Sequence, residues 1–227
     1  MCIDLIEMKR LASIFIFMFY VAVVHAQLFA EIGESFRKKP KFFFNFTQYN
    51  SFINKESANV SGIKAGLEFN DKVRVAVGYS WLYSDIVDRI NINKNDLSYT
   101  TNGQLKFNYI NTSFEYEIYS DYPWHISLPL VVGAGRAHYE YIDRVTRERT
   151  RTENSNVVLF EPSVNAQYNI IDWVGISGGL GYRVALNASK ELKKNFNSPI
   201  YVIQLKFFFD EMYKEIFPNG LKSKEKK

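Results

Sequence analysis

Cysteine, glycine and proline are all scarce in this chain of 227 residues, and each shortage excludes a class of protein. Cys2 is the only cysteine, so a small disulfide-bonded fold and a cysteine-based zinc site are excluded. Twelve glycines and six prolines are too few for collagen or a low-complexity linker. Aromatic residues make up 16% of the chain, which argues against intrinsic disorder. A mean hydropathy of −0.20 excludes a bundle of membrane helices but not a membrane barrel, whose strands face lipid with every second side chain.

Chemical motifs are equally scarce. No Walker loop is present, and the glycines at 133–135 and 178–181 lie inside predicted strands with no helix after them, so neither group predicts a nucleotide site. His125 and His138 have opposite parity on one predicted strand and cannot share a metal ion. The net charge of +4 is mild, and the basic end 222–227 has no interleaved aromatic residues for nucleic-acid binding. We therefore expect no cofactor, no metal and no nucleic-acid partner.

The N-terminus has the three parts of a secretory signal peptide. Met8-Lys9-Arg10 is a basic start, residues 11–24 carry no charge, and Val24-His25-Ala26 is a small-residue cleavage site. The alternative, a transmembrane anchor, needs roughly 20 apolar residues, and the uncharged run is shorter than that. We predict a cleaved signal peptide over 1–26, with 1–7 as an upstream extension, and export from the cytoplasm.

The rest of the chain alternates with a period of two, which is the period of a β-strand. Large apolar side chains at Val75, Val77, Tyr79 and Trp81, for example, alternate with charged, small or polar ones. No stretch of the body predicts a long helix. Eight strands are predicted, at 41–52, 59–69, 73–86, 103–119, 124–142, 156–169, 173–187 and 199–209.

The connections between these strands alternate in length. Short turns are predicted at 70–72, 120–123 and 170–172, and longer polar loops at 53–58, 87–102, 143–155 and 188–198. An even number of strands with short turns on one rim and long loops on the other is typical of a bacterial outer-membrane barrel. The predicted fold is an eight-stranded antiparallel up-and-down transmembrane β-barrel, with short periplasmic turns, longer extracellular loops and both termini in the periplasm.

The strands of a secreted soluble barrel also alternate between apolar and polar residues, so the composition of the two faces has to distinguish it from a membrane barrel. The polar face is rich in glycine, which suits a narrow lumen better than an exposed surface. The aromatic residues of the apolar face fall into two groups by depth, as membrane interfaces select. The group near the long-loop rim is Tyr79, Trp81, Tyr83 and Tyr182, and the group near the short-turn rim is Tyr116, Trp124, Tyr168 and Phe209. These eight residues are the predicted aromatic girdles, in contact with outer-membrane lipid.

An eight-stranded barrel is filled by side chains, so its inward charges must be paired. Strand parity predicts that Glu68 faces Arg74, that Glu117 faces His125, and that Glu161 and Arg183 are diagonal neighbours. The predicted lumen network plugs the barrel; the alternative is a salt-bridge gate for ions. Its members are Lys64, Glu68, Arg74, Glu115, Glu117, His125, Glu161, Arg183 and Lys206.

Three further features are less regular. The apolar set changes parity within 103–119, which predicts a bulge between Asn108 and Asn111. The segment 27–40 is predicted to be a periplasmic helix or an extra strand. The segment 210–227 is predicted to be a periplasmic tail that begins with a short helix, with Asp210 as its N-cap.

Two groups of residues invite a functional interpretation. His125, Ser127 and Glu117 offer a base, a hydroxyl and a carboxylate on one face, which is the material of a hydrolase. They point inward near the periplasmic rim, away from outer-leaflet lipid, so we expect no catalytic residues. The arginines of the loop 143–155 are predicted to be solvated, or alternatively to contact anionic lipopolysaccharide.

Four strand segments resemble the outer-membrane β-barrel proteins of Bacteroidetes-type bacteria, the PorT-like group included. The segments are 124–131 (WHISLPLV), 160–164 (FEPSV), 178–183 (GGLGYR) and 203–209 (IQLKFFF). The resemblance covers the predicted barrel, 41–209, and implies insertion by the barrel-assembly machinery with Phe209 as the terminal aromatic signal. Such barrels commonly end at this signal, whereas 210–227 follow it here.

The sequence thus predicts a non-enzymatic integral outer-membrane barrel with a plugged polar lumen, in a structural, surface-interaction or secretion-associated role. Three alternatives stay open: a small solute channel, a lipid-modifying outer-membrane enzyme, and a soluble periplasmic binding barrel. Protein partners are not specified by any motif.

Overall fold

The computed structural model describes residues 27–53, 56–94, 97–144, 146–187 and 196–217, so the predicted signal peptide lies outside the described residues. These residues form a single sheet of ten antiparallel strands. The strands are β1 (Lys41–Ile53), β2 (Glu56–Phe69), β3 (Val73–Leu82), β4 (Val87–Lys94), β5 (Leu97–Asp121), β6 (Trp124–Ile142), β7 (Arg149–Arg151), β8 (Ser155–Ile171), β9 (Val174–Ala185) and β10 (Ser198–Phe208).

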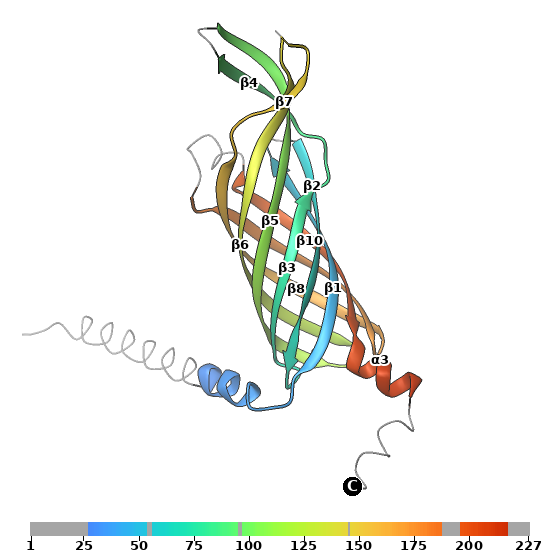
Figure 1. Ribbon diagram of the computed structural model, residues 1–227. Helices are drawn as coiled ribbons and strands as arrows, with labels where there is room; N and C mark the ends of the chain where they lie inside the picture. The colour runs from blue at the N-terminus through green and yellow to red at the C-terminus, as the bar shows by residue number, and fades with distance from the viewer. Residues whose placement is uncertain (1–26, 54–55, 95–96, 145, 188–195, 218–227) are drawn as a thin grey trace, which may run out of the picture.

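Eight of these strands close into a ring. The sheet order runs β5-β3-β2-β1-β10-β9-β8-β6, and a further pairing between β5 and β6 joins its two ends. The first and last strands are paired as well, from Phe43 with Phe208 to Ser51 with Ile200. The predicted eight-stranded antiparallel up-and-down barrel is therefore confirmed, and Figure 1 shows its strands wrapping one tapered cylinder.

The other two strands form an extension beyond one end of the barrel (Figure 1). β4 pairs with residues Leu97–Gln104 of β5, and β7 pairs with residues 140–142 of β6. The longer connections predicted at 87–102 and 143–155 thus contain short strands that the sequence analysis did not predict. Ile90 and Ile92 alternate with polar residues there, so this connection can form a hairpin although it has left the barrel wall.

The opposite end carries the short turns and both described ends of the chain (Figure 1). The predicted turn at 70–72 is confirmed, since Phe69 pairs with Val73, and Asn70 and Asp71 adopt φ values of 54° and 53°. Residues 27–35 are helical, which decides between the two predictions for 27–40. A second helix, α3 (Phe209–Ile216), follows β10. The predicted N-cap is wrong, because α3 begins two residues earlier than an N-cap at Asp210 would place it, and Phe208 holds the N-cap position.

The predicted bulge between Asn108 and Asn111 is also wrong. β5 pairs with β6 in unbroken register from Gly103 to Glu117, and the register shifts only between Glu117 and Tyr119. Leu105, Phe107 and Tyr109 face inward and are 1–3% exposed, while Ile110 faces outward. The apolar residues change parity because the inward side chains of β5 are apolar up to Tyr109 and polar or charged from Asn111 onward.

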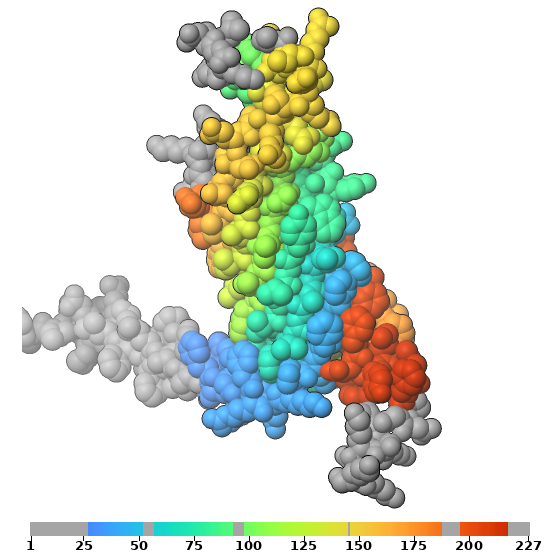
Figure 2. All heavy atoms as spheres, in the orientation of Figure 1, coloured from blue at the N-terminus to red at the C-terminus, as the bar shows by residue number. Residues whose placement is uncertain are grey.

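The barrel interior has two parts. Near the extension, an apolar core fills it, with Tyr49, Val60, Leu105, Phe107, Tyr109, Leu159, Phe196 and Ile200 among its buried members. Below this core most inward side chains are polar or charged, and they include Lys64, Arg74, Glu115, Glu161, Asn165, Gln167, Arg183 and Lys206. A small apolar cluster of Phe43, Ala76 and Phe208 lies among them. The outward face carries exposed apolar side chains, as Val77, Leu180 and Ile203 illustrate. Figure 2 shows its visible side as a closed surface of packed side chains.

No helix among the described residues is both long and apolar enough to cross a bilayer.

Candidate functional site

The charged interior is built by strand parity. Inward positions recur at every second residue, so neighbouring strands present their charges at matching heights. Four basic and four acidic side chains come from six strands, β2, β3, β5, β8, β9 and β10, and each is at most 7% exposed. They are Lys64, Glu68, Arg74, Glu115, Glu117, Glu161, Arg183 and Lys206.

Arg74 is the centre of the lower cluster, near the short turns. Its Nη2 lies 2.9 Å from Glu68 Oε1, and its Nη1 lies 2.9 Å from Glu115 and 2.6 Å from Glu117. Lys206 Nζ donates to the same Glu115 oxygen at 2.8 Å. Two cations thus face three carboxylates, all of them buried, and each of these five charges has a partner, as burial requires.

Arg183 and Glu161 form a separate pair nearer the apolar core. Arg183 Nε lies 2.5 Å from Glu161 Oε1, and these side chains are 0% and 1% exposed. Arg183 Nη1 also donates to Ser51 Oγ at 3.2 Å, and the Tyr109 hydroxyl lies 3.4 Å from Glu161. The pair thereby connects β1, β5, β8 and β9 across the interior.

Lys64 is the one predicted network member that bonds to a neutral group instead of a carboxylate. Its Nζ donates to the Tyr49 hydroxyl at 2.8 Å and lies 5.5 Å from the centroid of that ring. Tyr49 belongs to the apolar core, so this contact joins the charged part of the interior to the apolar part.

The predicted facing pairs meet, although one of them does so out of register. Glu68 and Arg74 are directly paired in register. His125 pairs in register with Ser120, not with Glu117, because the shift at the end of β5 displaces the partner. The imidazole nevertheless reaches back, and His125 Nδ1 lies 3.1 Å from Glu117 Oε1. Counting residues along the strands therefore predicted the correct face for Glu117 and His125, although it predicted the wrong pairing register.

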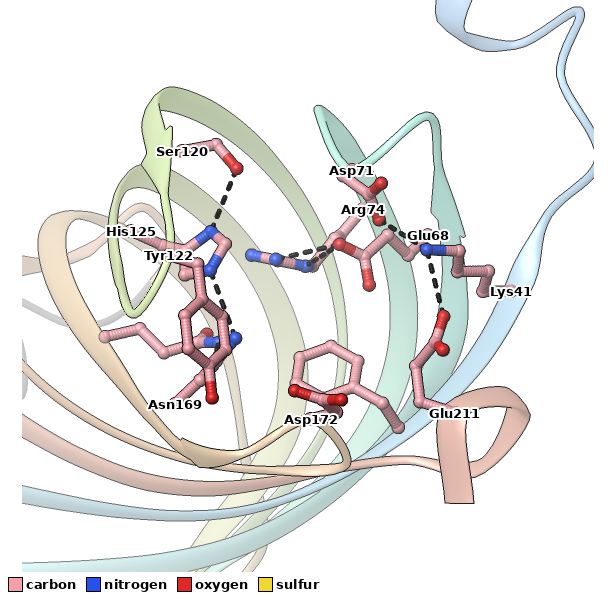
Figure 3. A pocket seen from close by; sticks show the side chains of 12 residues that line it. Lys41, Glu68, Asp71, Arg74, Ser120, Tyr122, His125, Asn169, Asp172 and Glu211 are labelled. Carbon is pink, nitrogen blue, oxygen red and sulfur yellow. Dashed lines mark hydrogen bonds and ion pairs between the residues drawn. The ribbon is translucent and has the colours of Figure 1, made fainter. Parts of the chain in front are cut away.

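A cavity of about 270 Å³ opens at the short-turn end of the barrel. Figure 3 shows Arg74 and Glu68 on one wall of this cavity, and His125 and Asn169 on the opposite wall. Its rim is lined by residues that the sequence analysis did not single out, Lys41, Asp71, Asp172 and Glu211. No local signal marks them, because they come from distant parts of the sequence and meet only when the barrel closes.

Helix α3 contributes one side of this rim. Lys41 Nζ lies 2.8 Å from Asp71 and 3.2 Å from Glu211. Partial burial acts to raise the pKa of Glu211, but hydrogen bonds from Lys214 and Lys41 outweigh it and hold that pKa below its ordinary value. The carboxylate is therefore ionised at neutral pH and holds α3 against the start of β1.

The hydrolase constellation does not assemble as the sequence suggested. His125 Nδ1 lies 3.1 Å from Ser120 Oγ, not beside Ser127, which is 2% exposed in the interior. The Glu117 carboxylate approaches the same ring nitrogen, and Nε2 faces Asn169 Nδ2 at 3.1 Å. A relay needs the hydroxyl and the carboxylate on opposite ring nitrogens, and this arrangement does not have them.

The predicted girdle residues lie in several environments on the outer wall. Tyr79, Tyr83, Trp124, Tyr168 and Tyr182 are exposed, and the rings of Trp124 and Tyr168 are in contact with centroids 5.0 Å apart. Trp81 and Tyr116 are half-buried. Phe209 lies in α3, outside the last strand, and its ring contacts Phe42.

Tyr116 connects the wall to the N-terminal helix. Its hydroxyl donates to Glu31 Oε2 at 2.6 Å, and Lys72 Nζ lies 3.2 Å from the other oxygen of that carboxylate. The hydrogen bond from Tyr116, with the positive charge of Lys72, holds the pKa of Glu31 below its ordinary value. The helix over 27–35 is thereby held against the outside of the barrel at the short-turn rim.

Comparisons with known proteins bear on the fold. No protein-family model and no curated protein matches the chain. Neisserial surface protein A is similar at 16% identity and a TM-score of 0.51, over 75% of this chain and 97% of that one. A major outer membrane protein from Thermus thermophilus is similar at 12% identity and a TM-score of 0.49, over 73% of this chain and 98% of that one. Ail of Yersinia pestis is similar at 12% identity and a TM-score of 0.43, over 74% of this chain and 96% of that one. The first likeness shows that the chain has the fold of an outer-membrane β-barrel.

Proposed function

We propose that the protein is a closed, non-conducting barrel of the bacterial outer membrane that serves as a rigid base for its extracellular β-extension. The observation that carries the proposal is the filling of the interior. An apolar core occupies the half near the extension, and a set of four basic and four acidic side chains lies in the rest. An ion entering from either side would have to displace packed aromatic rings or break buried ion pairs.

The outward face supports an outer-membrane location. Side chains such as Val77, Ile110 and Leu180 are 61–66% exposed, while Arg183 and Lys206 are fully buried inside. A soluble barrel would have these faces reversed, so the periplasmic binding barrel is the weaker alternative. Outer-membrane lipid and the barrel-assembly machinery are the partners that this proposal requires, after removal of a signal peptide. Membership of the Bacteroidetes-type, PorT-like family remains a proposal that rests on the four strand segments.

The extension is where a surface interaction would take place. It projects beyond the end of the barrel opposite the short turns (Figure 1). The Arg149 side chain on β7 is 74% exposed and its contact with Glu140 is long, at 3.9 Å, so its charge is available to an anionic surface such as lipopolysaccharide. Enzymatic activity is not part of the proposal, because Ser120 and Glu117 share one nitrogen of His125.

The proposal is tested by planar-bilayer conductance of the purified protein. We expect no steady current from the wild type. The control variant opens both parts of the interior. Phe107→Ser and Phe196→Ser remove two rings whose centroids lie 5.0 Å apart in the apolar core, and Arg74→Ser with Glu115→Ser removes the centre of the charged cluster, so this variant should conduct. A wild-type conductance that changes with Arg74→Ala or Arg183→Ala would instead establish the solute channel.

A further inference from the structure

Helix α3 is amphipathic, and its apolar face is uncovered. Phe209, Met212, Tyr213, Ile216 and Phe217 recur at spacings of three and four residues, which places them on one face. No residue of α3 is buried, and Tyr213, Ile216 and Phe217 are 49%, 57% and 54% exposed. An exposed stripe of large apolar side chains on so short a helix requires an apolar environment to be stable.

The polar face of α3 is the one that is attached to the barrel. The backbone amide of Phe42 donates to Asp210 Oδ2 at 3.0 Å, and Glu211 lies 3.2 Å from Lys41 Nζ. Both contacts are made with the first residues of β1. Because the polar side is turned toward the mouth of the barrel, the apolar side is turned away from it.

The apolar face of α3 continues the lipid-facing wall. The rings of Phe209 and Phe42 lie 5.6 Å apart, and Phe42 is an outward, 44% exposed residue of β1. On the same wall, the ring centroids of Phe44 and Phe46 lie 4.8 Å apart, and those of Phe46 and Phe207 lie 6.2 Å apart. An aromatic surface therefore extends from α3 up the wall formed by β1 and β10.

The position of α3 fits the same environment. Figure 1 shows it leaving the last strand at the short-turn end and running sideways from the wall, and Figure 2 shows its side chains protruding from the flank of the barrel. Trp124 and Tyr168, which are exposed aromatic residues, lie on strand ends at the same rim. Such residues gather at the depth at which a bilayer passes from acyl chains to headgroups.

We propose that α3 is an interfacial helix that lies in the periplasmic leaflet, with its apolar face on the acyl chains and Lys214 and Glu215 among the headgroups. The partner of this surface is the phospholipid bilayer. The proposal rests on the proposed membrane location of the barrel. It gives the chain that follows β10 a second membrane contact and fixes the last strand beside the first.

The test uses spin labels in the full chain with Cys2→Ser, reconstituted in phosphocholine vesicles. Single cysteines are placed at Ile216 on the apolar face, at Glu215 on the polar face as the matched control, and at Ile203 on the wall. Ile203 is 50% exposed and reports whether the barrel itself is in the membrane. Power-saturation EPR then compares collisions with oxygen, which concentrates among acyl chains, and with a water-soluble nickel complex.

With Ile203→Cys in lipid, we expect the oxygen-to-nickel ratio at Ile216→Cys to be several-fold higher than at Glu215→Cys. Equal ratios at these two positions, or a water-like ratio at position 216, would overturn the interfacial helix while leaving the barrel in place. Shielding of position 216 from both reagents would assign the face to a protein partner and also overturn it. A water-like ratio at Ile203→Cys would refute the membrane location itself.

Discussion

Replacing Arg183 by Met tests whether the buried ion pairs hold the barrel together. The substitution keeps a long unbranched side chain but removes the guanidinium that lies 2.5 Å from Glu161, in a pair that is at most 1% exposed. Among the described residues, the hydrogen-bond partner left to Glu161 would be the Tyr109 hydroxyl, at 3.4 Å. Leaving one member of a buried pair uncompensated costs about 3–5 kcal/mol. Arg183→Met should therefore lower the free energy of unfolding by about that amount.

The double variant Arg183→Met, Glu161→Gln separates this cost from the loss of packing. With both charges gone, no ion of this pair is left uncompensated, and replacement of a whole buried pair is often neutral or stabilising. We expect the double variant to recover most of the stability that the single variant loses. Lys214→Met is the surface control. Its pair with Glu211 is half exposed at the lysine, so its loss should cost roughly 0.2–1 kcal/mol.

The measurement is reversible unfolding by urea in detergent micelles, followed by tryptophan fluorescence and by the mobility of unboiled samples on a denaturing gel. A cost for Arg183→Met no larger than that of the surface control would refute the stabilising role of the pair. A double variant as unstable as the single one would refute it as well, because the cost would then lie in packing and not in the unpaired charge.

Two further predictions concern packing and pH. A Cβ at Gly133 would lie 2.6 Å from the Tyr109 ring, whereas nothing lies within 4 Å of one at Gly178, so Gly133→Ala should cost about 1–3 kcal/mol in the same urea assay and Gly178→Ala much less. The lowered pKa of Glu31 means that its ionised form is favoured by the fold. The stabilisation it provides is present above the ordinary carboxyl pKa of about 4.3 and is lost as pH falls through the lowered value. Tyr116→Phe should raise that pKa, as NMR titration of the carboxyl would measure; an unchanged value would contradict the assignment.

Strand parity accounts for most of the fold that the sequence predicts. It depends only on which side of a sheet a residue faces, and that side is determined by counting from a neighbour. The meeting of Glu68 and Arg74 is predictable because one short turn separates their strands. Where a strand gains a residue, as β5 does after Glu117, counting fails for the register although the facing side chains still find each other.

The mouth of the barrel could not be predicted in the same way. Lys41 and Glu211 are in contact only because the first strand pairs with the last one, which brings together residues from opposite ends of the chain. Phe209 shows the same limit. An aromatic residue suits the end of a strand equally well, but the backbone has already turned into helix α3 at Phe209, and Asp210 and Glu211 hold that helix against β1.

The apolar core near the extension explains why the sequence predicted a bulge between Asn108 and Asn111. The inside of a barrel faces neither water nor lipid, so its polarity follows from its own neighbours and not from a solvent. Where Arg74 and Glu115 line it, the strands alternate and both faces are evident. Where Phe107, Tyr109 and Phe196 line it, the inward set of β5 is apolar as well and the alternation changes phase, which is why a change of filling resembled a bulge. Because the interior side chains at each height contact mainly one another, one barrel can hold an apolar aromatic core at one end and buried ion pairs at the other.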